Sequence, residues 1–104
     1  MAKTDINGVK KYLCQCLLEK NIEVTNIALF GSHLTDNTNT DSDIDFIVIS
    51  KSFINKTIFE RAEMMIGIEE TVIQKFDVPL DILLKTPKEF ENLLESKMLY
   101  AEVI

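Results

Sequence analysis

Three aspartates and one Gly-Ser pair have the types and spacing that chemistry requires. Asp43 and Asp45 are separated by one residue, Asp81 lies in a later apolar run, and Gly31-Ser32 directly follows an earlier one. Carboxylates within apolar stretches are costly unless they are paired or bind a cation. Mg²⁺ prefers carboxylate oxygens and is commonly held by one or two of them together with substrate phosphates. These residues therefore indicate a site that handles a phosphorylated substrate with divalent ions.

Each part of this set has a separate physical role. Like charges at Asp43 and Asp45 repel each other when they share a strand face, and a divalent ion between them relieves the repulsion. The absent side chain of Gly31 lets phosphate oxygens approach the backbone, and the Ser32 hydroxyl can donate a hydrogen bond to them. Asp81 is left to join a metal or to accept a proton. The combination predicts phosphoryl chemistry with an anion cradle, a metal pair and a third carboxylate.

The elements that must position these residues follow from the hydrophobic pattern. Short apolar runs at 26–30, 43–49 and 78–84 predict strands, with Asp45 and Ile47 on one face of the second strand and Phe46 on the other. Helical spacing predicts a helix from Ile6 to about Glu19 and a single long helix over 57–76. Thr86-Pro87-Lys88-Glu89 predicts a further helix start, because it combines an N-cap, a first-turn proline and a capping-box glutamate.

The order of elements predicts an α/β (α+β) domain, in which helices pack on a small mixed sheet of three or four strands. Residues 99–104 are either the last of these strands or a partner-binding tail. With 104 residues the chain is expected to form a single domain, 1–104. Arg61, the one arginine, is interpreted as a surface charge that could reach a phosphate.

Charge and composition narrow the function classes. The net charge is −6 and the pI about 4.7, and no lysine and arginine stripe is present, so direct binding to a nucleic-acid backbone is disfavoured. The amino-terminal residues lack the apolar core of a signal peptide, and no apolar run is long enough to span a membrane. We therefore expect a cytoplasmic protein without a membrane segment.

The run GSHLTDNTNTDSDIDF, together with VPLDILL around Asp81, resembles the signature of the polymerase-β-type nucleotidyltransferases. The small size and the ending FENLLESKMLYAEVI are similar to the minimal members, called MNT domains. The resemblance implies a polymerase-β-like fold, Mg²⁺ as cofactor (two ions, with Mn²⁺ as a substitute) and ATP as donor. It also implies an antitoxin that transfers an adenylyl group to its HEPN-type toxin partner. We expect the acceptor to be a tyrosine of that partner. The chain is expected to form a homo- or hetero-oligomer.

The resemblance also assigns roles to single residues. It implies that Asp43 and Asp45 bind the metal ions, and that Asp81 completes the metal site and activates the attacking hydroxyl. Gly31 and Ser32 are implied to contact the triphosphate. Two positions depart from the family pattern: His33 stands where members commonly have arginine, and Asp36 where they have glycine. A lost positive charge and an added negative charge are expected to weaken triphosphate binding.

Two other functions stay open at the level of sequence. The same fold could be a non-catalytic antitoxin that covers its partner, with the nucleotide site weakened by His33 and Asp36. A nucleotidyltransferase for a small molecule such as an aminoglycoside is the third hypothesis, although the chain leaves little room for a dedicated acceptor domain. His33 itself is either a triphosphate ligand or a solvent-exposed loop histidine, and the second is the commoner role for such a residue.

Overall fold

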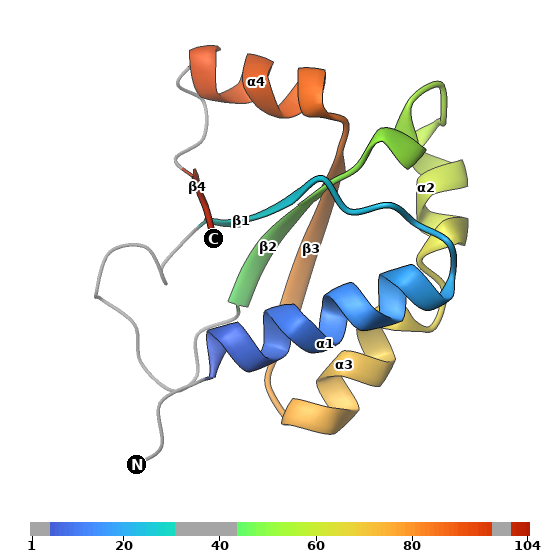
Figure 1. Cartoon of the computed structure of the whole chain (residues 1–104), viewed down its shortest axis with the longest axis vertical. Coiled ribbons are helices and arrows are strands. Elements are labelled where there is room, and N and C mark those ends of the chain that lie inside the picture. Colours follow the sequence, from blue (N-terminus) through green and yellow to red (C-terminus); the bar gives the residue numbers. More distant parts are fainter. Residues whose placement is uncertain (1–4, 31–43, 97–100) are drawn as a thin grey trace.

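The computed structural model describes residues 5–30, 44–96 and 101–104 (Figure 1). The first four of its elements are α1 (Ile6–Glu19), β1 (Asn26–Phe30), β2 (Ile44–Ile49) and the short 3-10 helix η2 (Lys51–Phe53). They are followed by α2 (Ile58–Met64), α3 (Ile68–Phe76), β3 (Leu80–Lys85), α4 (Pro87–Ser96) and β4 (Ala101–Val103). None of the helices within these ranges has the length and hydropathy needed to cross a membrane.

The four strands form one mixed sheet in the order β3-β2-β1-β4. β1 runs antiparallel to both β2 and β4, while β2 and β3 are parallel, with register from Ile44↔Leu80 to Ile49↔Lys85. The expected α+β fold with a small mixed sheet is therefore confirmed. Of the two alternatives for residues 99–104, the strand is correct for Ala101–Val103, because β4 pairs with the edge of β1.

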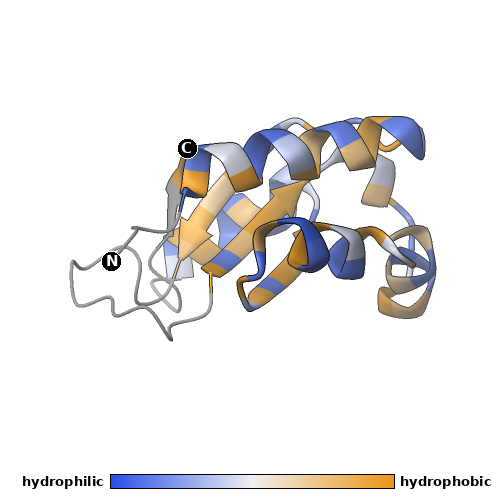
Figure 2. Ribbon diagram, turned by 90° about the horizontal axis from the view of Figure 1, so that it is seen from below, coloured by the Kyte–Doolittle hydropathy of each residue, from blue (hydrophilic) through white to orange (hydrophobic). Residues whose placement is uncertain are grey.

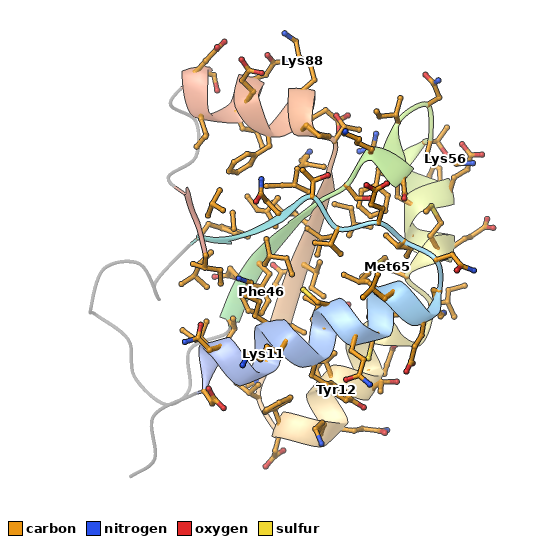
Figure 3. All side chains as sticks on the ribbon, in the orientation of Figure 1. Lys11, Tyr12, Phe46, Lys56, Met65 and Lys88 are labelled. Carbon is orange, nitrogen blue, oxygen red and sulfur yellow. The ribbon has the colours of Figure 1, made fainter. Side chains whose placement is uncertain are left out.

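The larger hydrophobic core lies between the sheet and the helices α1 and α3. Alternate strand residues such as Ile44, Phe46 and Val48 are fully buried there against Leu13 and Val72. Phe46 points from β2 toward this core in Figure 3. In Figure 2 the strands are mostly orange and the helices alternate blue and orange, as expected for buried strands and amphipathic helices.

The opposite face of the sheet carries a smaller core under α4. Phe90 of α4 packs there with Ala28, Ile47 and Ile49, and Phe30 and Leu83 are partly buried beside them. The predicted start of α4 is confirmed, because the Thr86 hydroxyl accepts from the Glu89 amide at 3.2 Å and the Glu89 carboxylate accepts from the Thr86 amide at 2.9 Å. This capping box fixes α4 at the end of β3.

The prediction of one long helix over 57–76 is wrong. α2 ends at Met64, a three-residue turn follows, and α3 begins at Ile68 with Gly67 as its N-cap at φ 84°. This left-handed conformation is easily reached by glycine and costly for other residues, so Gly67 permits a change of direction that a continuous helix would exclude. As a result, α3 packs on the sheet and α2 runs in a different direction.

Candidate active site

Asp45 and Asp81 are register partners on the parallel strands β2 and β3. Partners on neighbouring strands have backbones about 4.8 Å apart, and their side chains leave the sheet on the same face. Both aspartates lie on the face that carries Ile47, opposite to Phe46. The sequence prediction of their faces is thus confirmed, and two negative charges are placed side by side.

Phe30, which directly precedes Gly31-Ser32 in the sequence, lies beside Asp45 in the sheet. Phe30, the last residue of β1, lies opposite Asp45 on one side and opposite Ala101 on the other. Because β2 starts at Ile44, both ends of the segment 31–43 join the sheet beside Asp45. The sequence-predicted residues of this segment lie outside the described residues, namely Gly31, Ser32, His33, Asp36 and Asp43.

Glu69 of α3 is a third carboxylate, within range of the Asp81 charge. Burial raises the pKa of Glu69, and the negative charges of Asp81 and then Glu70 raise it further. Sequence reasoning missed Glu69, because a glutamate at an intermediate position of an amphipathic helix carries no signal that separates it from an ordinary surface charge. Asp45 is half-buried and Asp81 is exposed, so the pair is open to a ligand from solvent.

The donor set is consistent with a hard divalent cation. Within the described ranges no group of three or more His, Cys, Asp or Glu residues could hold a metal by itself. Two adjacent carboxylates nevertheless match the usual protein share of a Mg²⁺ site, in which the remaining ligands are waters and substrate phosphates. Asp45 and Asp81 therefore fit Mg²⁺ as part of a metal–nucleotide site, not as a closed structural cage.

Arg61 has a structural role, and the interpretation of a surface charge that could reach a phosphate is wrong. The side chain is buried, and its Nη1 and Nη2 donate to the two Glu89 carboxylate oxygens at 2.6 and 3.2 Å. Its Nε and Nη1 also donate to the carbonyls of Lys56 and Leu84. α4 begins directly after the end of β3 (Figure 1). Leu84 lies near this end, so its bond to Arg61 holds Arg61 at the opposite end of β3 from Asp81.

Paired aspartates on adjacent strands of a small mixed sheet, with helices on both faces, define a domain of the nucleotidyltransferase type. The chain belongs to the polymerase beta nucleotidyltransferase family, whose model matches residues 13–102. Among solved structures it is similar to a proposed nucleotidyltransferase from Sulfolobus solfataricus, at 16% identity and a TM-score of 0.56, over 99% of this chain and 87% of that one. At this identity the likeness shows the fold alone.

A second solved structure with partial likeness is the BolA domain of SufE1 from Arabidopsis thaliana, at 16% identity and a TM-score of 0.49, over 86% of this chain and 99% of that one. No curated protein matches the sequence significantly. The family assignment thus rests on the family model that matches residues 13–102, and the likeness to the Sulfolobus protein supports the fold.

Proposed function

We propose that the chain is a Mg²⁺-dependent nucleotidyltransferase that transfers AMP from ATP to a hydroxyl acceptor. The observation that carries the proposal is the placement of Asp45 beside Asp81 on parallel strands, next to the point where the Gly31-Ser32 segment leaves β1. Two like charges on neighbouring strands repel each other, and divalent ions with a triphosphate between them relieve this repulsion.

In the proposed reaction the acceptor hydroxyl oxygen attacks the α-phosphorus of ATP. A new oxygen–phosphorus bond forms, the bond from the α-phosphorus to the bridging oxygen breaks, and pyrophosphate leaves. Asp81 accepts the hydroxyl proton, while Asp43, Asp45 and Asp81 hold the divalent ions. When bound, Mg²⁺ or Mn²⁺ neutralises the charge that develops on the phosphate oxygens.

The triphosphate is assigned to Gly31, Ser32 and His33. A backbone without a side chain and a donating hydroxyl suit phosphate oxygens, and a histidine can contribute a further donor. Because His33 replaces the arginine that is common in the family, we expect weaker binding of the triphosphate than an arginine would give.

The acceptor is proposed to be a tyrosine of a HEPN-type toxin, so that the chain acts as an antitoxin in the cytoplasm. The net charge of −6 argues against a polynucleotide acceptor, and the partnership itself follows from the likeness to MNT domains. Support from the fold is limited to the open position of Asp81, which another chain can approach.

The test is mass spectrometry of a HEPN-domain protein after incubation with the chain, ATP and Mg²⁺. We expect the partner to gain the mass of one or more adenylyl groups, and Asp45→Asn to prevent the gain. Asp77→Asn is a matched control, because Asp77 is an exposed α3 cap at φ 52°, where asparagine is well tolerated. Tight binding without any change of mass would instead favour the non-catalytic antitoxin, to which His33 and Asp36 already point.

A further inference from the structure

Large hydrophobic side chains gather on the outer side of α2. Ile58 and Phe59 are 73% and 76% exposed, and Ile66, in the turn after the helix, is 66% exposed. Ala62 lies one helical turn after Ile58, and Ala62 and Ile66 line the same pocket, so these four residues form one strip. We refer to Ile58, Phe59, Ala62 and Ile66 as the α2 strip.

The exposure of the α2 strip follows from how α2 is attached. Arg61 occupies the inner side of the helix, where its bonds to Glu89 and to the Leu84 carbonyl hold α2 against the sheet and α4. With Arg61 turned inward, Phe59, two positions before it, lies on the opposite side of the helix, because each residue turns the helix by about 100°. The strip is therefore held in a fixed orientation, and its exposure is a property of the packed fold.

A pocket of about 250 Å³ continues the α2 strip toward the sheet. Ala62 and Ile66 line it from the strip, and Ile82 and Leu84 line it from β3. β3 is the outer strand on this side of the sheet. A partner side chain that enters the pocket would therefore contact the strip and the sheet edge together.

The rim of this pocket is acidic. Glu69 and Glu70 line it, and no described lysine or arginine does. Lys20 approaches from the end of α1 and donates to the Ile66 carbonyl, but it is not part of the lining.

We propose that the α2 strip and its pocket bind an amphipathic helix of a partner protein, with apolar residues along one face and lysine or arginine at its border. Apolar anchors in a hydrophobic groove provide affinity in this mode of recognition, and complementary charges select the partner. A second copy of this chain is a poor occupant, because it would bring the same glutamates and a net charge of −6 to an acidic rim.

The surface shares the edge strand β3 with the proposed active site. The side chains of Asp81 and Ile82 leave β3 on opposite faces of the sheet, because they are consecutive strand residues. Glu69 on the rim is within range of the Asp81 charge, which contributes to its raised pKa. A partner bound here would lie against the strand that carries Asp81. A role for this partner as the acceptor rests on the proposed function, whereas the docking surface does not.

The experiment is an NMR titration of the isotope-labelled chain with two short helical peptides. Both have leucine at every third or fourth position, and their remaining positions are lysine in one and glutamate in the other. We expect the lysine peptide alone to bind, with shifts confined to the α2 strip, Glu69, Glu70 and Ile82. Phe59→Ala should weaken binding roughly tenfold or more. The double change Glu69→Gln and Glu70→Gln should weaken it about threefold and reduce its salt dependence.

Leu18→Ala is the matched control, because Leu18 is 65% exposed on α1 and does not line this pocket. Equal binding of both peptides, or shifts at another surface, would overturn the proposal. So would sedimentation of the wild type as a dimer that Phe59→Ala converts to a monomer, since a second copy would then cover the strip. Asp81→Asn should bind the lysine peptide normally, so a failure of transfer and a failure of docking are told apart.

Discussion

At the end of the β2–β3 pair where α4 begins, Arg61 donates to both carboxylate oxygens of Glu89, and Glu89 also accepts from the Thr86 amide. At the other end of the same two strands, Asp45 and Asp81 carry like charges side by side. At the first end, opposite charges are paired and the hydrogen-bond donors find acceptors within the chain. The second end concentrates negative charge at an open position, with Glu69 adding to it from α3.

The comparison separates charges that hold the fold together from charges that are proposed to bind a ligand. A buried arginine with a bidentate partner and two carbonyls is satisfied by the protein, so its removal should affect stability. Adjacent carboxylates cost stability in the absence of a cation, so their removal should affect activity and leave the fold intact. Mutations at the Arg61 end should therefore lower stability, and mutations at the Asp81 end should lower activity.

The largest effect is expected at Asp81. Asp81→Asn should lower the rate of nucleotide transfer by roughly 10²- to 10⁴-fold, because the amide cannot accept the hydroxyl proton. Much of the nucleotide affinity should remain, since Asp81 serves the acceptor more than the triphosphate. Transfer assays together with urea unfolding would check both parts. Transfer at the wild-type rate, or a large loss of stability, would contradict the assignment of this end to function.

Removal of the divalent ion should have the next largest effect. Without Mg²⁺ or Mn²⁺, the carboxylates repel the triphosphate, so a chelator should weaken ATP binding by roughly a hundredfold. Titration calorimetry with and without chelator measures this directly. In Asp45→Asn the dependence on the metal should be smaller. Equal affinities of the wild type under both conditions would remove the proposed role of the aspartates.

At the opposite end, Glu89→Gln should lower the free energy of unfolding by about 2 kcal/mol. The change weakens two charge-assisted hydrogen bonds and leaves Arg61 buried without its counter-charge. Glu91→Gln, an exposed position on the same helix, is the control and should change stability little. Metal-dependent ATP binding should survive both substitutions, and a selective loss of it in Glu89→Gln would show that the two ends are coupled.

The two ends should also respond to pH with opposite signs. Hydrogen bonds from Arg61 hold the pKa of Glu89 below its ordinary value, so its contribution to stability is present above about pH 4.3 and is lost as the pH falls through the lower folded value. The pKa of Glu69 is raised, chiefly by burial, so the favourable part of its contribution is present at low pH and is lost as the pH rises through the folded value.

At neutral pH, Glu69→Gln should therefore stabilise the protein by a few tenths of a kcal/mol, while Glu89→Gln destabilises it. Both differences from the wild type should shrink toward about pH 3, where both carboxyl groups are largely protonated in the unfolded chain. Denaturant unfolding across this range is the measurement. A destabilising Glu69→Gln at neutral pH would contradict the acidic crowding at the Asp81 end.

Alternation along the strands was the part of the fold that sequence could predict. The faces of Asp45, Phe46 and Asp81 follow from a period of two residues, and the start of α4 follows from a local capping box. The break at Gly67 was missed, because an isolated glycine inside a helical pattern is usually tolerated and only tertiary packing decides its conformation. The burial of Arg61 was missed for a similar reason, since its partner Glu89 is far along the chain.

The parallel register of β2 and β3 also has an evolutionary consequence. A shift of one residue in either strand would reverse its faces, so that Asp45 would exchange places with the buried Phe46, or Asp81 with the partly buried Ile82. Single-residue insertions or deletions within these strands should therefore remove the site and the fold together. We therefore expect changes of length to be tolerated between the strands but not within β2 or β3.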